Sequence, residues 1–148
     1  YGGYMTLMLL GQSPGTFKAG VAGTPVTDYR LYDTHYTERY LGTPQENPEA
    51  YRLSNVLTYA PAIRVRLLIM HGMADDNVLF TNTTLLIPAL VASGQPFEVV
   101  PYPGSRHGAL TFRETGIHGW KTIFDFFDRH LAASAPRDAT SAPGGDGS

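Results

Sequence analysis

The chain contains no cysteine, which excludes a disulfide framework, a thiolate zinc site and a cysteine nucleophile. The chain also has no large excess of positive or negative charge, since it has 11 lysines and arginines and 13 aspartates and glutamates. This balance offers no electrostatic surface for a nucleic-acid backbone or an anionic membrane. The longest apolar stretches, 7–10 and 65–70, the second interrupted by Arg66, are far shorter than the ~20 residues of a membrane-spanning helix. We therefore expect no nucleic-acid partner and no membrane segment in this chain.

The length and composition predict one folded part followed by a tail. The chain has 148 residues, of which 43 % are hydrophobic and 16 % charged, as in ordinary globular domains. It opens at Tyr1 rather than at a methionine, and we interpret it as a piece of a longer protein. Residues 132–148 are mostly alanine, serine, proline and glycine, which bury too little apolar surface to offset chain entropy. We predict a folded part over residues 1–131 and a disordered tail over 132–148.

Helix-like and strand-like segments alternate along the folded part. Apolar residues predict a buried helix over 3–10 that Gly11 closes, and the period predicts a second helix over 81–93 with Gly94 as its stop and a kink at Pro88. A third helix is predicted near the end, where an apolar stripe at helical spacing should dock on the sheet: Ile117, Trp120, Ile123, Phe124, Phe127 and Leu131. The remaining signals predict three strands, over 18–26, 65–70 and 97–102.

This alternation is typical of a parallel α/β sheet flanked by helices. The aliphatic run 65–70 favours a strand that is covered on both faces. Three strands would leave both edges of the sheet open, so we expect further strands in the longer protein. Segment 27–59 interrupts the alternation, because it is long, rich in tyrosine and charge, and without a clean period. Long insertions of this kind often carry binding functions.

Two polar loops follow the second and third predicted strands. Residues 71–78 carry Asp75 and Asp76, and residues 103–108 carry His107. Functional side chains of parallel sheets project from such turns at the carboxyl ends of the strands. An aspartate followed by a histidine is the second half of the Ser, Asp, His order of α/β-hydrolases.

The start of the chain fits the first half of that order. A nucleophile elbow reads G-x-S-x-G and leads directly into a helix, and Tyr1 and Gly2 match its last two positions. The nucleophilic serine is then expected immediately before Tyr1. We predict a partial α/β-hydrolase fold, namely the C-terminal portion of a mostly parallel sheet flanked by helices.

Four strings resemble the catalytic domain of the prolyl oligopeptidase family, and most closely its dipeptidyl peptidase IV branch. They are YGGY at 1–4, YDTHYTERY at 32–40, HGMADDNV at 71–78 and HG at 107–108. The resemblance runs from residue 1 to about residue 131. It implies a serine exopeptidase that releases dipeptides from the N-termini of peptide substrates and prefers proline or alanine at the second position. It also implies an N-terminal β-propeller outside this chain and, by analogy, a homodimer and an exported or periplasmic location.

The resemblance assigns catalytic roles to two residues. His107 matches the general base, for which the ordinary imidazole pKa of about 6.5 is suitable. Asp75 matches the carboxylate that orients this histidine and stabilises the imidazolium. From the residues alone, Asp75 and Asp76 are close to interchangeable. If Asp75 is the carboxylate that orients the histidine, Asp76 becomes a turn residue that hydrogen-bonds its own backbone.

The resemblance also implies a set of substrate-binding residues. Asn77 would bind a substrate carbonyl, for which an ordinary turn-forming role is the alternative, and the backbone N–H of Tyr1 would donate to the oxyanion. The pocket for the residue before the scissile bond would be walled by Tyr1, Val26, Tyr29, Tyr32, Tyr36 and Val78. An apolar box of aromatic rings suits proline, which has hydrocarbon faces and no N–H. Tyr29 departs from the family, in which tryptophan is common, and this leaves the size of the pocket open. Ordinary core packing is the alternative for these tyrosines.

The other histidines have weaker functional claims. His71 is expected to be packed at the end of its strand, and His35, His118 and His130 to be structural or solvated. No cofactor is expected, and two carboxylates with one imidazole are a poor signal for a metal site. We expect this chain alone to be inactive, because the nucleophile lies outside it. For the whole protein, the alternatives are a catalytically silent interaction scaffold and an endopeptidase or esterase on the same fold.

Overall fold

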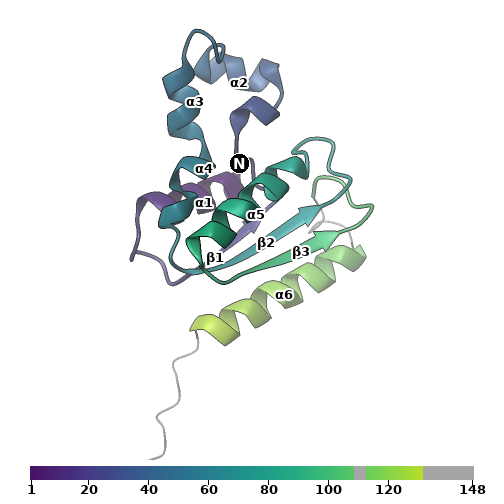
Figure 1. Cartoon of the computed structure of the whole chain (residues 1–148). Coiled ribbons are helices and arrows are strands. Elements are labelled where there is room, and N and C mark those ends of the chain that lie inside the picture. Colours follow the sequence, from purple (N-terminus) through teal and green to yellow (C-terminus); the bar gives the residue numbers. More distant parts are fainter. Residues whose placement is uncertain (109–112, 132–148) are drawn as a thin grey trace, which may run out of the picture.

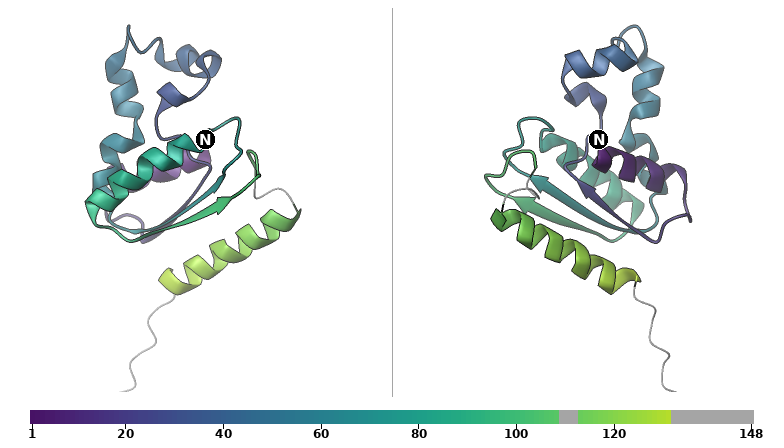
Figure 2. Two further views of the ribbon diagram at one scale, coloured as in Figure 1. Left: turned by 45° about the vertical axis from the view of Figure 1, so that its right-hand side comes forward. Right: turned by 180° about the vertical axis from the view of Figure 1, so that it is seen from behind.

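A computed structural model of the chain describes residues 1–108 and 113–131 (Figure 1). At its centre are the parallel strands β1 (Ala19–Gly23), β2 (Arg66–Gly72) and β3 (Phe97–Tyr102), which lie in the order β1-β2-β3. Helices α1 (Gly2–Gln12) and α5 (Thr81–Ser93) cover one face, and α6 (Arg113–Leu131) covers the other (Figure 2). This arrangement confirms the predicted α/β class with a parallel sheet.

Strand β2 is covered on both faces, as its aliphatic composition predicts. Successive side chains of a strand point to opposite faces of the sheet. Accordingly, Leu67 and Ile69 belong to the core cluster formed with α1 and α5, whereas Leu68 and Met70 pack with α6. The strand continues through His71 and Gly72, two residues beyond its predicted end.

Glycine marks the end of α5 but not the end of α1. Gly94 follows α5 with a φ of 69°, a left-handed conformation that favours glycine and ends helices. Gly11 instead lies inside α1, where a β-carbon would be 2.7 Å from the β-carbon of Tyr59. The prediction that Gly11 closes the first helix is therefore wrong. The glycine allows α1 to approach the segment that precedes β2.

Strand β1 is shorter than the segment 18–26 predicted for it. It ends at Gly23, and Thr24 follows with a φ of 42° that turns the chain out of the sheet. Val26 therefore lies beyond the strand. The start of α1 packs closely on this strand end, since a β-carbon on Gly3 would be 2.3 Å from the carbonyl oxygen of Gly23.

The predicted docking face of α6 is largely wrong. Ile117, Trp120 and Phe124 are 55 %, 51 % and 62 % exposed, and Leu131 is also exposed. The buried stripe instead contains Gly116, Gly119, Ile123 and Phe126, and Phe127 packs beside it. Ile123 and Phe127 are the members of the predicted stripe that contact the sheet cluster. Glycines carry no hydrophobic signal, so the sequence pattern did not identify the correct face.

Segment 27–59 contains short helices that stand away from the sheet (Figure 1). Three of them begin at side-chain caps, because the side chains of Asp28, Asp33 and Asn55 accept the backbone N–H groups of Arg30, Tyr36 and Leu57. The elements are η1 (Tyr29–Leu31), α2 (Thr34–Leu41), α3 (Pro48–Ser54) and α4 (Val56–Tyr59), and η2 (Ala60–Ala62) leads on to β2. Among the described residues, no helix is long and apolar enough to cross a membrane.

Candidate active site

Two loops leave neighbouring strands at the same end of the sheet. The acid loop, residues 73–78, follows β2, and the histidine loop, residues 103–108, follows β3. Backbone hydrogen bonds connect the acid loop to the end of β3 and to the histidine loop: the Met73 N–H donates to the Tyr102 carbonyl and the Ala74 N–H to the Ser105 carbonyl, both at 3.0 Å. Their relative position is therefore fixed by the backbone rather than by exposed side chains.

Asp75 and His107 meet across these loops. The carboxylate of Asp75 is fully buried, and its Oδ2 lies 2.8 Å from Nδ1 of His107. Its Oδ1 accepts the backbone N–H groups of Asn77 at 3.0 Å and Val78 at 2.9 Å. Because the carboxylate oxygen is the acceptor in this contact, Nδ1 of His107 is the donor and carries a proton, and Nε2 is the acceptor when the ring is neutral.

Asp76 lies outside this pairing. Its exposed carboxylate forms an ion pair at 3.0 Å with exposed Arg106 of the histidine loop. The prediction that Asp76 is the turn residue that bonds its own backbone is wrong, since Asp75 accepts both turn N–H groups. The structure thus distinguishes two carboxylates that the residues alone left interchangeable.

His71 is packed, as predicted, directly behind the acid loop. Its fully buried ring places Nε2 2.8 Å from the Val78 carbonyl oxygen and 3.4 Å from Oδ2 of Asp75. Because a carbonyl only accepts, Nε2 donates, and Nδ1 accepts the hydroxyl of Thr83 at 2.7 Å. Burial lowers the pKa of His71 below its ordinary value, although the Val78 carbonyl and the Asp75 carboxylate act in the opposite direction. The ring is therefore neutral.

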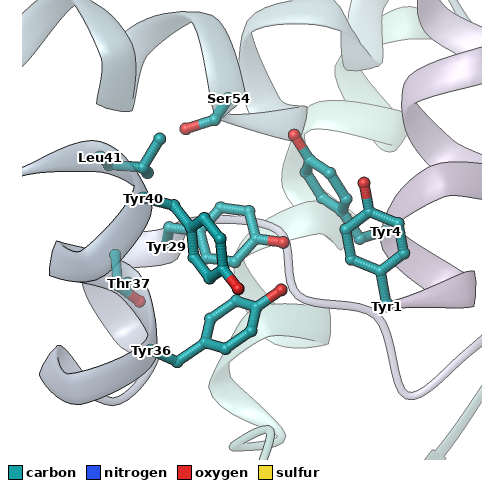
Figure 3. Close-up of a pocket in the computed structure, with 8 residues that line it drawn as sticks. All are labelled: Tyr1, Tyr4, Tyr29, Tyr36, Thr37, Tyr40, Leu41 and Ser54. Atoms are coloured by element: carbon teal, nitrogen blue, oxygen red, sulfur yellow. The ribbon is translucent and has the colours of Figure 1, made fainter.

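A cavity of about 380 Å³ lies beside the start of α1 (Figure 3). All its lining side chains are uncharged: Tyr1, Tyr4, Tyr29, Tyr36, Thr37, Tyr40, Leu41 and Ser54. Its tyrosines belong to a continuous series of ring contacts that runs from Tyr1 through Tyr32 to Tyr40, with centroid separations from 5.0 to 6.4 Å. Burial raises the pKa of Tyr29 far above its ordinary value, so its hydroxyl stays protonated.

The predicted pocket walls divide into three groups. Tyr1, Tyr29 and Tyr36 line the cavity. Tyr32 belongs to the ring series, and its hydroxyl donates to Oδ1 of Asn77 at 2.8 Å. The two predicted valines, Val26 and Val78, are instead buried in the core cluster with α1 and β2.

Two tyrosines that line the cavity were absent from the predicted set. Tyr4 follows Tyr1 by three positions, and Tyr40 follows Tyr36 by four, so each pair shares a helix face. This helical spacing is the sequence signal that could have identified them. The alternative of core packing holds in part, because Tyr4 and Tyr29 belong to the buried core cluster.

The remaining histidines also have local partners or lie on the surface. His118 Nδ1 lies 2.9 Å from the Tyr102 hydroxyl, and His130 Nε2 lies 3.2 Å from a Glu98 carboxylate oxygen. His35 is exposed at the start of α2. Over residues 1–108 and 113–131, no group of three or more histidine, aspartate and glutamate side chains is placed to hold a metal ion.

Comparison with known proteins identifies the family. The model of the prolyl oligopeptidase family matches residues 1–134. Dipeptidyl peptidase 8 of Homo sapiens is 43 % identical over 136 residues, which are 90 % of this chain and 15 % of that protein. Probable dipeptidyl-aminopeptidase B of Neurospora crassa is 52 % identical over 112 residues, which are 73 % of this chain and 12 % of that protein.

A solved structure gives the same result for the fold. The structure of Porphyromonas gingivalis dipeptidyl peptidase 4 superposes with a TM-score of 0.85 and 43 % identity, over 88 % of this chain and 18 % of that one. This similarity confirms the predicted partial α/β-hydrolase fold. The chain spans less than a fifth of the length of these relatives. The family match over residues 1–134, together with the shared fold, shows that the chain belongs to the prolyl oligopeptidase family.

Proposed function

We propose that the full-length protein containing this chain is a serine peptidase that releases N-terminal dipeptides, with Asp75 and His107 as two members of its catalytic triad. The observation that carries this proposal is the 2.8 Å contact between Oδ2 of the buried Asp75 and Nδ1 of His107. This pairing fixes the tautomer in which Nε2 has a free electron pair, as a general base requires. The similarity to dipeptidyl peptidases supports the same reaction class.

In the proposed reaction, the nucleophile is a serine immediately before Tyr1. His107 Nε2 takes the proton from the serine Oγ while Oγ bonds to the carbonyl carbon of the scissile peptide. The resulting imidazolium then gives this proton to the leaving amine, the C–N bond breaks, and an acyl-enzyme remains. Water, deprotonated by the same nitrogen, attacks the ester, and the serine recovers its proton as the dipeptide leaves. Asp75 stays ionised and stabilises the imidazolium in each half-reaction.

The start of α1 supplies stabilisation for the oxyanion. Tyr1 is the N-cap of this helix, and the unpaired N–H groups at a helix N-terminus favour negative charge. In the full-length protein, the Tyr1 N–H directly follows the proposed serine and donates to the carbonyl oxygen as its charge develops. The acid and histidine loops leave the same end of the sheet at which β1 ends, because β1, β2 and β3 are parallel.

We further propose that the tyrosine-lined cavity favours proline or alanine at the second substrate position. Aromatic faces suit the hydrocarbon surface of a pyrrolidine, and an uncharged lining disfavours charged side chains. The Tyr32 hydroxyl occupies Oδ1 of Asn77, so the amide N–H groups of Asn77 are directed to other acceptors. Asn77 thereby binds a substrate carbonyl, as the family resemblance implies.

Two measurements on the full-length protein test this proposal. A fluorophosphonate probe should modify the residue immediately before Tyr1, and absence of this adduct would favour a catalytically silent scaffold. A Gly-Pro chromogenic substrate should be cleaved, whereas its acyl-blocked form, which lacks the free amine, should not. Rapid turnover of the blocked form would identify an endopeptidase or esterase instead. Labelling a variant with alanine before Tyr1 provides the matched control.

The rest of the proposal concerns the parts outside this chain. We propose that the additional length of the protein contributes the remaining strands of the catalytic domain and a β-propeller, and that the protein forms a homodimer. This chain alone is then inactive, because loss of the serine in a comparable triad costs about six orders of magnitude in turnover. Separate expression of residues 1–131 should give no cleavage above the uncatalysed rate.

A further inference from the structure

We propose that Gly72, the last residue of β2, is a positioning residue that sets the distance between His107 and Asp75. This inference rests on the proposed function, because it concerns how the proposed base is aligned. Gly72 makes no contact with substrate in the proposed reaction and has no titratable group. Its effect is exerted through the backbone of the histidine loop, which lies against it.

The space beside Gly72 is already filled by this loop. A β-carbon built on Gly72 would lie 2.4 Å from the carbonyl oxygen of Ser105 and 2.7 Å from that of Arg106. Both distances are shorter than the contacts that β-carbons make in real proteins. Both neighbours are backbone atoms, which cannot rotate away as the end of a flexible side chain can. Any side chain at position 72 must therefore displace the backbone immediately before His107.

Conformational freedom does not explain the glycine at this position. Gly94 and Gly104 have φ values of 69° and 76°, which other residues rarely adopt, whereas Gly72 has no positive φ. Gly72 lies in the regular ladder between β2 and β3, paired with Tyr102. The requirement at position 72 is thus for space alone, and the group that fills this space is the histidine loop.

Hydrogen bonds prevent the loop from moving away without also disturbing the acid loop. The Ser105 carbonyl, which lies nearest to Gly72, accepts the Ala74 N–H at 3.0 Å. The Gly72 carbonyl in turn accepts the Asp75 N–H at 3.3 Å. Gly72 is therefore the point where both loops converge, with Asp75 three residues along one and His107 two residues beyond Ser105 on the other.

The test compares two glycine-to-alanine substitutions in the full-length protein. Gly72→Ala should displace the Ser105 carbonyl and lower kcat for Gly-Pro cleavage about 10- to 100-fold, because small misalignments of reacting groups have effects of this size. KM should stay within about twofold, because the substrate pocket does not involve this contact. The rate of fluorophosphonate labelling should fall in parallel with kcat.

Gly23→Ala is the matched control, because Gly23 is the last residue of β1 as Gly72 is of β2, and the substitution adds the same methyl group. A β-carbon on Gly23 meets no described atom within 4 Å, so both kinetic constants should stay at wild-type values. A wild-type kcat in folded Gly72→Ala would overturn the proposal. So would a rise in KM equal to the fall in kcat, because this would indicate a general structural defect rather than displacement of the base.

A second variant keeps the proposal testable if Gly72→Ala does not fold. Gly104→Ala strains the exposed turn of the same loop through its positive φ, with no described atom within 4 Å of the new β-carbon. A selective fall in kcat would support control of His107 by the loop backbone, and an unchanged kcat would contradict it. If the wild type neither labels nor cleaves Gly-Pro, the proposed function itself fails, which is a separate result.

Discussion

Replacing Asp75 with asparagine in the full-length protein separates its charge from its structural role. Asparagine keeps one oxygen, which can still accept the N–H groups of Asn77 and Val78 and preserve the turn. Its second group is an NH₂ donor, and this group faces Nδ1 of His107 at the position where Oδ2 now lies 2.8 Å away. The imidazole must then accept at Nδ1 and carry its proton at Nε2. In this tautomer it cannot take the serine proton.

The expected loss follows from this change of tautomer. In a comparable triad, the same substitution lowers kcat about 10⁴-fold, which corresponds to about 5 kcal/mol of transition-state stabilisation. KM for a Gly-Pro chromogenic substrate should change little, because the lining of the cavity is untouched. Initial rates over a range of substrate concentrations give both constants. Circular dichroism and thermal unfolding establish that the variant remains folded.

Asp76→Asn is the control, because the two carboxylates are adjacent in the sequence. Asp76 is exposed and pairs with exposed Arg106, and such pairs contribute little to stability. Its replacement should leave kcat within about twofold of wild type. A kcat for Asp75→Asn above a tenth of the wild-type value would refute the proposed role of the carboxylate. An equal loss in both variants would show that the effect is due to loop charge rather than to the contact with His107.

Three further substitutions test the surroundings of the pair. Tyr32→Phe removes the hydroxyl that orients Asn77, and initial rates should show KM increased about 2- to 10-fold with kcat nearly unchanged, as expected for one lost hydrogen bond. Asn82→Ala removes the side-chain acceptor of the buried Thr27 N–H, whereas the Thr27 hydroxyl keeps the backbone carbonyl of residue 82, and denaturant unfolding should show a loss of about 2 kcal/mol. His71 is neutral in the folded protein because burial lowers its pKa, whereas the unfolded chain binds a proton below about pH 6.5. Stability should therefore fall as pH decreases from 7 to 5, and this fall should be smaller in His71→Gln if the buried ring causes it.

Local sequence signals were sufficient for most of the sheet and for α5. The strand prediction 97–102 agrees with β3, and Gly94 follows α5 in the left-handed conformation expected of a helix stop. These features depend on residues close together in the chain, namely β-branched runs and a glycine at a helix end. The end of β1 was missed because Thr24, a non-glycine residue, turns the chain with a positive φ.

The face of a helix that packs on the sheet depends on shape as well as hydrophobicity. Gly116 and Gly119 are buried on the same side of α6 as Ile123 and Phe126, which pack with the sheet. Trp120 and Phe124 are more hydrophobic but exposed, with their rings 6.1 Å apart. A hydrophobic pattern assigns the largest apolar residues to the core, and it fails where glycines form part of the buried face.

The pairing of Asp75 rather than Asp76 also could not follow from composition. Both are aspartates in one turn, and the difference is set by which carboxylate points back toward the N–H groups of Asn77 and Val78. That direction is determined by the path of the loop, which depends on its hydrogen bonds to the histidine loop some thirty residues later. The family resemblance favoured Asp75, and the path of the loop gives the physical reason for its contact with His107.

The two halves of the site are held by different kinds of interaction. Backbone hydrogen bonds join the acid and histidine loops, so few substitutions can alter the contact between them. A substitution of Gly72 is an exception, because any side chain there meets the backbone of the histidine loop. Side chains hold the tyrosine-rich segment, through Thr27 with Asn82 and Tyr32 with Asn77. Substitutions can therefore alter the pocket while Asp75 and His107 keep their geometry. Under the proposed function, the preference at the second substrate position can then change without a change in the proposed catalytic residues.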